Sequence, residues 1–417
     1  MIVRYRLFYI LFFIFYFSSV FAADTVQKIL NPFFRTIIVE KENQFLSPPV
    51  IQLGSGERIV VSFDEIGEDW SRLQYRLIHC NADWQPSRLI ESEYIDGFNF
   101  ADIDDYAFSS NTFINFVNYR FTIPSEDMKI TASGNYVVEV YPQDDPEDVV
   151  LRARFQVSED AAHVEGRVTP RTDRGYNSEW QQVELAVNSG SREINPYNDI
   201  LISVVQNRRP DTETFVRHPV RVADGKYIYE HLWELIFPAS NEYRRFETVR
   251  EDYPGMGVAR VGFEGQNYQA WLNTDSGRET HEYSYDQTQK GRFMIDSYSA
   301  TDPDLGADYV TVHFSLDFPQ LMNGDIYIDG DFTNHLAEEA YRMKYDPETR
   351  LYTLSLPLKQ GSYNYQYVAL KDGEKKATTS LIEGNKYETE NEYLVSVYYR
   401  SPTGRADRLI GSATVYP

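Results

Sequence analysis

Short segments in which apolar and polar residues alternate recur along most of the chain. Alternation with a period of two is typical of a β-strand with one buried and one solvated face, because successive side chains point to opposite faces. Helical periodicity over three turns is nearly absent, and residues 334–343 are predicted to form a short helix or an irregular loop. The predicted strands are 58–63, 73–78, 136–141, 149–157, 182–187, 199–205, 260–263, 309–316, 325–328, 351–356 and 394–399.

Turn-forming residues separate these strands, as at 142–148, Asp224-Gly225 and Asp372-Gly373. Many short strands with frequent turns predict an all-β fold of tandem immunoglobulin-like or early-set β-sandwich domains. Two stretches rich in polar and small residues, 157–166 and 297–307, are interpreted as domain seams. Together with a signal peptide they divide the chain into 1–22, 23–160, 161–300 and 301–417, and the three domains have normal sandwich sizes.

Two similar segments begin strands in the first and last of these domains. Ser133-Gly134-Asn135-Tyr136 and Gln360-Gly361-Ser362-Tyr363 each place a glycine two residues before a tyrosine. Immunoglobulin-like domains often carry such a tyrosine, whose hydroxyl bonds back across the corner. The repetition supports related sandwich folds in the two domains.

The N-terminus has the three-part pattern of a secretory signal peptide. Arg4 and Arg6 precede the apolar run 7–17, and Val20-Phe21-Ala22 offers compact residues to a signal peptidase. The apolar run is well under the roughly 20 residues that a membrane-spanning helix needs. We therefore expect a cleaved signal peptide at 1–22 and a mature protein that is soluble after export.

The net charge limits the kinds of partner that the protein can bind, and the cysteine content limits how its fold can be stabilised. The formal net charge of −23 argues against nucleic acid and anionic lipid, whose recognition needs clustered Lys and Arg, and favours a basic partner surface. Cys80 is the one cysteine, so the fold has no internal disulfide and depends on its cores. The simplest interpretation of Cys80 is a small buried residue.

The densest local motif is His79-Cys80-Asn81-Ala82-Asp83-Trp84, where a strand passes into a loop. In a metal-binding interpretation His79, Cys80 and Asp83 are ligands, but a closed site needs at least one more, which the sequence does not single out. In the favoured structural interpretation Asp83 makes turn hydrogen bonds and Trp84 covers a core. Trp84 is also the one candidate partner-binding residue, since tryptophan is enriched at interface hot spots.

The sequence has no recognisable motif for a serine hydrolase, a phosphate-binding site or a calcium site. The histidines are scattered, and neither a Gly-x-Ser-x-Gly elbow nor a phosphate loop is present. The acidic clusters 102–105, 144–148 and 302–304 lack the spacing of an EF-hand and are interpreted as solvated turns. We predict no catalytic residues, no metal and no cofactor.

Several segments together resemble the Plug protein family of the Bacteroidota type IX secretion system. The most specific are His79–Trp84 and Tyr94-Ile95-Asp96-Gly97-Phe98, followed by Ser109-Ser110-Asn111-Thr112 and, later, Val205-Gln206-Asn207. The resemblance implies a periplasmic protein without enzymatic activity, held at the inner face of the outer membrane by a protein partner. That partner is a very large outer-membrane β-barrel translocon, whose periplasmic mouth the plug seals when no cargo is engaged.

The last domain is also similar to glycogen-binding early-set immunoglobulin modules, over 325–334, 358–367 and Asp372-Gly373. Those modules stack glucan on tryptophans and add a lysine. The matching positions here hold His335 or its neighbours, Gln366 or Tyr367, and Lys375 or Lys376. Because sugar stacking needs flat aromatic faces, the resemblance implies a retained fold and a lost glucan site. A periplasmic or surface carbohydrate-binding protein is the alternative function, and it predicts exposed aromatic side chains from Asp308 onward.

Overall fold

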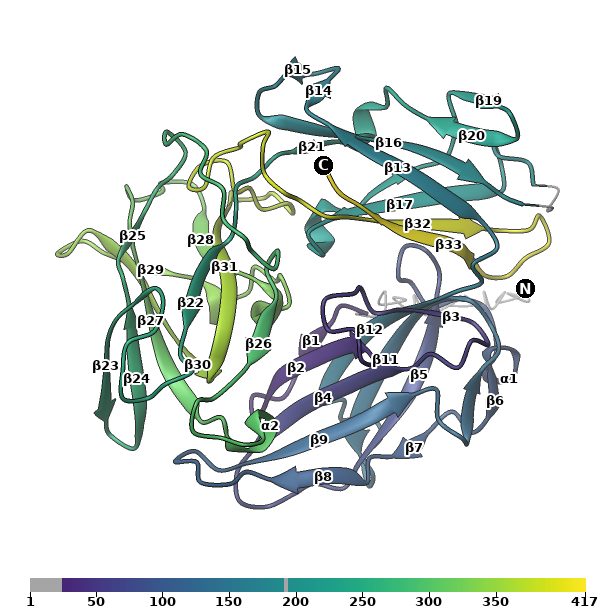
Figure 1. Ribbon diagram of the computed structural model, residues 1–417. Helices are drawn as coiled ribbons and strands as arrows, with labels where there is room; N and C mark the ends of the chain where they lie inside the picture. Colours follow the sequence, from purple (N-terminus) through teal and green to yellow (C-terminus); the bar gives the residue numbers. More distant parts are fainter. Residues whose placement is uncertain (1–24, 191–193) are drawn as a thin grey trace, which may run out of the picture.

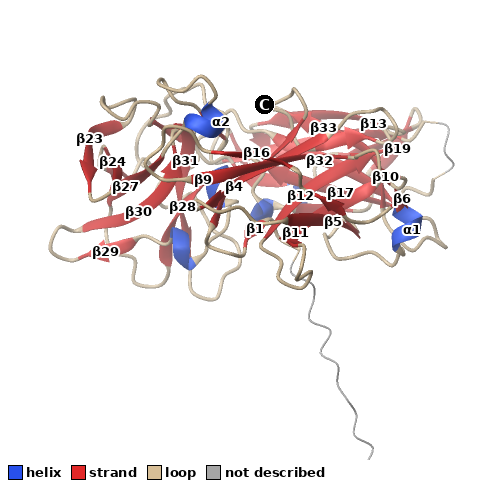
Figure 2. Ribbon diagram, turned by 90° about the horizontal axis from the view of Figure 1, so that it is seen from below, coloured by secondary structure: helices blue, strands red, loops and turns tan. Residues whose placement is uncertain are grey.

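The computed structural model describes residues 25–190 and 194–417, and in this part the chain forms three β-sandwiches around a common centre (Figure 1). A view turned by 90° shows that the body is much thinner in this direction (Figure 2). The predicted all-β class and sandwich architecture are confirmed. The predicted signal peptide, 1–22, lies outside the described residues.

The N-terminal sandwich comprises residues 25–158. One sheet has the order β1-β12-β11-β5-β7, with β3 parallel to β12, and the other has the order β2-β4-β9-β8. Aromatic side chains such as Phe63, Tyr119 and Tyr136 fill the space between the sheets. The elements are β1 (Lys28–Ile29), β2 (Phe34–Lys41), β3 (Val50–Gln52), β4 (Ile59–Ile66), β5 (Leu73–Cys80), α1 (Glu91–Tyr94), β6 (Ile95–Gly97), β7 (Ala101–Asp102), β8 (Asp105–Phe108), β9 (Phe116–Ile123), β10 (Met128–Ile130), β11 (Gly134–Pro142) and β12 (Leu151–Ser158).

The middle sandwich is built from two separate parts of the chain, 163–238 and 393–415. One sheet has the order β13-β16-β20-β19, with β21 beside β16, and the other has the order β18-β17-β32-β33. Figure 1 shows the yellow C-terminal strands lying beside β17. The elements are β13 (His163–Thr169), β14 (Arg171–Thr172), β15 (Gly175–Tyr176), β16 (Trp180–Asn188), β17 (Ile200–Gln206), η1 (Pro210–Thr212), β18 (Thr214–Val216), β19 (Arg221–Ala223), β20 (Lys226–Tyr229), η2 (Trp233–Leu235), β21 (Ile236–Pro238), β32 (Tyr393–Tyr399) and β33 (Arg408–Val415).

The inserted sandwich lies between β21 and β32 in the chain and includes all strands from β22 to β31. Its sheets are β22-β31-β26, with β28 beside β31, and β23-β24-β27-β30-β29, with β25 beside β27. The elements are β22 (Arg244–Glu247), β23 (Val258–Glu264), β24 (Asn267–Leu272), β25 (Asp275–Ser276), β26 (Phe293–Ile295), α2 (Pro303–Gly306), β27 (Tyr309–Asp317), β28 (Asp325–Asp329), η3 (Asp331–Thr333), η4 (Glu339–Tyr341), β29 (Lys344–Asp346), β30 (Leu351–Lys359) and β31 (Gly361–Leu370).

The sandwiches divide the chain differently from the predicted ranges 161–300 and 301–417. The C-terminal strands belong to the middle sandwich, because Val395 and Val397 pack with Val183 and Ile202 in one core. The stretch 297–307 contains α2 and joins β26 to β27 inside the inserted sandwich, so it is not a seam. The stretch 157–166 does connect two sandwiches, since β12 ends at Ser158 and β13 begins at His163.

The two glycine–tyrosine segments form the predicted corners. Tyr136 donates its hydroxyl hydrogen bond to the carbonyl of Ala132 at 2.7 Å, and Tyr363 donates in the same way to the carbonyl of Lys359. Each bond spans four residues, so the N-terminal and inserted sandwiches share this device.

Residues 334–343 form an irregular loop that contains the single turn η4. In the described part of the chain, the helices are too short to cross a membrane.

Candidate functional site at the junctions between the sandwiches

A buried ion pair joins the N-terminal sandwich to the inserted sandwich. The Nζ atom of Lys359, at the end of β30, lies 2.7 Å from Oδ2 of Asp64 on β4, and both side chains are almost fully buried. Tyr309 and Asn118 each donate a further hydrogen bond to Asp64, at 2.8 Å. Nearby, Asp308 accepts from the backbone amides of the β8–β9 loop at 2.6 and 3.0 Å. A buried carboxylate with this many donors fixes the relative position of two domains.

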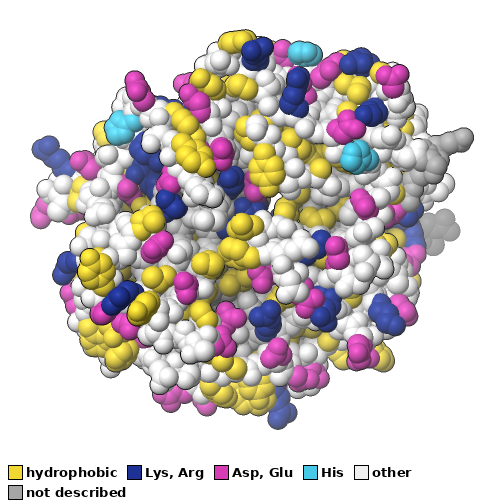
Figure 3. All heavy atoms as spheres, in the orientation of Figure 1, with side chains coloured by type: hydrophobic (Ala, Val, Ile, Leu, Met, Phe, Trp, Pro, Cys, Tyr) yellow, Lys and Arg dark blue, Asp and Glu magenta, His cyan; other side chains and the backbone are white. Residues whose placement is uncertain are grey.

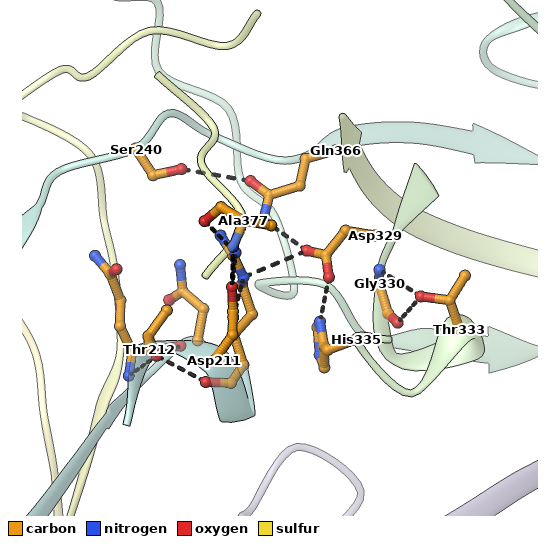
Figure 4. A network of polar contacts seen from close by, with 12 residues as sticks. Asp211, Thr212, Ser240, Asp329, Gly330, Thr333, His335, Gln366 and Ala377 are labelled. Carbon is orange, nitrogen blue, oxygen red and sulfur yellow. Dashed lines mark hydrogen bonds and ion pairs between the residues drawn. The ribbon is translucent and has the colours of Figure 1, made fainter. Parts of the chain in front are cut away.

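A second polar network lies where the inserted sandwich meets the middle sandwich (Figure 4). Asp329, the last residue of β28, receives a bond from Gln366 at 2.7 Å and lies 3.0 Å from Nδ1 of His335. Arg209, beside η1 of the middle sandwich, forms an ion pair with Asp211 at 2.7 Å and lies 3.8 Å from Asp329. The network therefore crosses from one domain to the other through buried charged groups.

His335 is held between two carboxylates. Its Nε2 lies 2.7 Å from Oδ1 of Asp331, and Asp331 also pairs with Arg208 of the middle sandwich at 2.9 Å. Burial alone would lower the pKa of His335, but the charges and hydrogen bonds of Asp329 and Asp331 outweigh it and raise the pKa to about 9. Burial opposes ionisation of Asp329, yet His335 and Arg209 hold the pKa of that carboxyl below its usual value. His335 is therefore a cation at neutral pH.

Buried amides hold the segment that leads from the inserted sandwich back into β32. Asn391 donates to the side-chain oxygen of Gln181 at 2.8 Å, and Asn207 donates to Asn391 at 2.7 Å. Gln181 also donates to the carbonyls of Tyr387 and Thr389, at 2.8 Å each. These bonds fix the chain at the place where one domain is inserted into another.

The His79–Trp84 motif lies at the third junction, between the N-terminal and middle sandwiches. The backbone amide of Ala82 donates to Oδ2 of Asp407 at 3.0 Å, and the amide of Asp407 donates to the side chain of Asn81 at 3.1 Å. Asp407 also accepts from Arg400 at 2.6 Å. The motif is thus a joint between two domains.

Trp84 lies half-buried at the centre of the molecule. The guanidinium carbon of Arg154 is 4.3 Å from the centre of its ring, and its backbone φ of 61° is in the left-handed region, which bulky residues rarely adopt. Trp84 and Arg154 line an open cavity, to which all three sandwiches contribute, including Arg208 and His335. Its predicted role as a partner contact stays a prediction.

The rest of the motif has structural roles. Cys80 is fully buried, and burial raises the pKa of its thiol to about 12. His79 lies 3.0 Å from the carbonyl of Ser133, and burial lowers the pKa of its imidazole. Asp83 accepts from the amide of Gln85 at 3.2 Å, which is the turn bond expected from the sequence. Within 25–190 and 194–417, no group of three or more His, Cys, Asp or Glu side chains is placed to hold a metal ion.

Of the positions that resemble a glucan site, His335 and Gln366 are part of the junction, whereas Lys375 and Lys376 are exposed. His335 and Gln366 are both bonded to Asp329 and are buried with it. Among residues 308–417, the one tyrosine or phenylalanine that is well exposed is Tyr416, near the C-terminus. The aromatic platform that the carbohydrate alternative predicts is therefore not found among residues 308–417.

Sequence reasoning missed Arg208, Arg209 and the Asp64–Lys359 pair. Arg208 and Arg209 directly follow Gln206-Asn207, which the family resemblance included, but a basic pair after a strand usually faces solvent. Asp331 and His335 lie in or next to the segment that resembles sugar-binding modules. That resemblance did not indicate an ion-pair network. In β4, IVVSFDEI, Asp64 stands next to Glu65, so the local sequence does not distinguish it from a solvated carboxylate.

Comparisons with known proteins agree with the earlier resemblance. A model of the first domain of type 9 secretion system plug proteins matches residues 34–159, which is nearly the whole N-terminal sandwich. A protein from Parabacteroides merdae, described as hypothetical, has a crystal structure that matches this chain with a TM-score of 0.93. The two are 38% identical, and the match covers 94% of this chain and 99% of that chain.

Other similarities are much weaker. The B domain of a biofilm-associated protein is 8% identical with a TM-score of 0.19, and the match covers 92% of this chain and 86% of that chain. A partial N-terminal region of an enterococcal surface protein is 8% identical with a TM-score of 0.20, and the match covers 94% of this chain and 95% of that chain. These values support no conclusion about fold or function, and no curated protein matches the chain. On the match to the plug model and the whole-length relative, the chain belongs to the type 9 secretion system plug protein family.

Proposed function

We propose that this protein is a periplasmic plug that binds the periplasmic mouth of the outer-membrane β-barrel translocon of type IX secretion and seals it when no cargo is engaged. The observation that carries the proposal is the match of residues 34–159 to the first domain of the plug family. Family membership connects the chain with type IX secretion, and the shape and junctions of the molecule support the more specific role.

The body has the mechanical properties that a plug needs. Its three sandwiches lie side by side in one flat layer (Figures 1 and 2), and side chains cover most of the centre on the face shown in Figure 3. Bonds between buried or partly buried groups join all three pairs of sandwiches, through Asp64–Lys359, Asp331–Arg208 and Ala82–Asp407. Small domain interfaces usually allow relative motion, but breaking these bonds would leave buried charges unpaired. Such a body can block a wide opening without deforming.

We include in the proposal that the protein is not an enzyme. The ionisable groups of the central network already bind one another, as Asp329 binds His335 and Gln366, and Arg209 binds Asp211. General acids and bases must reach a substrate and change protonation near the working pH. His335 is buried and stays protonated well above neutral pH, so it does not meet these requirements.

The test uses a strain of the native bacterium that lacks the chromosomal gene and carries a tagged copy. We expect the tagged protein to copurify with the barrel from solubilised outer membranes, identified by mass spectrometry. We also expect the deletion strain to admit an antibiotic too large for ordinary porins, and the tagged copy to restore exclusion. An impermeable outer membrane in the deletion strain, together with no copurified barrel, would refute the proposal.

A further inference from the structure

One edge of the flat body carries an unusual number of exposed aromatic side chains. We call this surface the aromatic rim and define it by the exposed Trp70, Phe108, Phe113 and Phe263 and the half-buried Tyr106 and Tyr268. The exposed fractions of Phe108, Phe113 and Phe263 are 50%, 57% and 48%. Figure 3 shows hydrophobic side chains gathered at the lower edge, over β8 and the β23–β24 hairpin. Single exposed aromatic residues are common, but groups of them mark interaction surfaces.

The rim side chains are held in two packed groups. In the first, the Trp70 ring stacks on Tyr106 at a centroid distance of 4.7 Å, and Tyr106 contacts Phe108 at 6.4 Å. In the second, the ring centroid of Phe113 lies 4.9 Å from that of Phe263 and 5.2 Å from that of Tyr268. Rings fixed by their neighbours lose little conformational entropy when a partner covers them.

The β8–β9 hairpin and the bonds of Asp308 to its loop connect the two groups. Tyr106 and Phe108 belong to β8, Phe113 lies in the loop that leads to β9, and Phe263 comes from the inserted sandwich. Asp308 holds this loop by accepting from the amides of Phe113 and Ile114. The rim therefore spans two sandwiches in a single rigid arrangement.

β8 is also the end strand of its sheet. It pairs with β9, and in the described part of the chain no strand pairs with its other edge. Proteins normally cover or charge such an edge because it invites association. Here it carries exposed Phe108 together with acidic residues, which fits a surface that a partner covers.

Acidic side chains predominate along the border of the rim, which also carries the exposed Arg72 beside Trp70 and Arg120 opposite Asp105. Glu68 and Asp69 precede Trp70, Asp104 and Asp105 precede Tyr106, and all four are exposed. Glu264, which follows Phe263, is exposed as well. An apolar centre with a charged border is the usual composition of a protein interface, and complementary charge speeds association.

We propose that the aromatic rim is the docking surface for a protein partner that presents an apolar patch bordered by Lys and Arg. This inference rests on the proposed function, in which that partner is the translocon barrel. The rim rings enter the apolar patch, and the acidic border aligns with the basic residues around it.

The experiment compares three tagged proteins in the deletion strain. The rim variant carries Trp70→Ser, Phe108→Ser and Phe263→Ser. The control variant carries Trp233→Ser, Tyr176→Ser and Tyr253→Ser, which remove three aromatic side chains of 64–66% exposure outside the rim. Both variants are first shown to have the thermal unfolding midpoint of the unmodified protein to within a few degrees.

We expect the rim variant to copurify with at least tenfold less barrel than the unmodified protein and to leave the outer membrane permeable. The control variant should behave as the unmodified protein does. Charge reversal by Asp104→Lys and Asp105→Lys should slow association of the purified proteins and weaken its salt dependence.

The outcomes separate the two proposals. If the unmodified protein brings down no barrel, the proposed function fails and this inference fails with it. If the unmodified protein and the rim variant bring down equal amounts of barrel, the plug function stands and the docking surface is refuted. Equal losses in the rim and control variants would also refute a specific role for the rim.

Discussion

Asp64 and Lys359 are 295 residues apart in the chain, yet they form an ion pair of 2.7 Å in the interior of the molecule. The Nζ of Lys359 also lies 4.0 Å from the ring centre of Phe116 and donates to the carbonyl of Asp304 at 2.6 Å. Removing one partner of such a pair leaves the other as an uncompensated buried charge, which is far more costly than losing both.

The first prediction concerns this pair. Lys359→Met should lower the free energy of unfolding by about 3–5 kcal/mol, because Asp64 remains buried without its cation. The double variant Lys359→Met/Asp64→Asn should be more stable than Lys359→Met alone. Urea denaturation of the unmodified protein, the single variant and the double variant measures both effects. A double variant that is less stable than Lys359→Met alone would contradict the argument.

The second prediction is a loss of stability at alkaline pH through His335. The pKa of this group rises from 6.5 in the unfolded chain to about 9 in the folded protein. Protonation of His335 contributes about 3 kcal/mol to the free energy of unfolding. This contribution is fully present below about pH 6.5 and is lost as the pH rises through about 9. Denaturant titrations between pH 6 and 9.5 should show this fall. His335→Asn should be less stable at pH 6 and nearly flat over the same range.

The third prediction concerns the two tyrosine corners. Tyr136→Phe and Tyr363→Phe each remove a hydroxyl that binds a backbone carbonyl, at a cost of about 1–2 kcal/mol. The two residues lie in different sandwiches, so their effects should add. Thermal unfolding of both single variants and the double variant tests this, and a clear departure from additivity would indicate coupling between the sandwiches.

The fourth prediction concerns the joint formed by the His79–Trp84 motif. Asp407→Ala removes the acceptor of the Ala82 amide and the partner of Arg400. We expect faster hydrogen exchange at residues 80–86 and 400–408, with little change in the inserted sandwich. Arg221→Ala, which removes an exposed ion pair with Glu230, is the control. Uniformly faster exchange would mean that Asp407 stabilises the whole body and not one joint.

The fifth prediction is that Cys80 is inert in the folded protein. Its side chain is buried and burial raises the pKa of the thiol to about 12, so little thiolate is present or accessible. An aromatic disulfide reagent should modify the thiol at once in denaturant and at the rate of unfolding in its absence. Rapid modification of the native protein would show that the loop after β5 opens.

Local patterns in the sequence located part of the strands, and long strands such as β9 and β33 were not predicted. Each of the predicted strands overlaps a strand of the structure, because alternation within eight or so residues reports directly which face is buried. The strands that were missed include β2, where Thr36 has a φ of 57° and the register shifts, which interrupts the alternation.

Pairing partners could not be predicted in the same way. The segment 394–399 was expected as a strand, but its pairing with β17 depends on residues nearly 200 positions earlier. Val397 would be equally suited to any apolar core, so nothing in its neighbourhood assigns it to the middle sandwich. For the same reason the network around Asp329 and Arg209 appears only when the domains are placed together.

The insertion of one sandwich into another also sets an order of folding. The N-terminal sandwich is complete once Ser158 has been made, whereas the middle sandwich lacks β32 and β33 until the last residues of the chain arrive. Until then β17, with the sequence ILISVVQ, exposes an unpaired apolar edge that could pair with another molecule. A chain cut short before Tyr393 would keep that edge open, so C-terminal truncation is expected to yield aggregates or strand-exchanged dimers instead of a smaller stable protein.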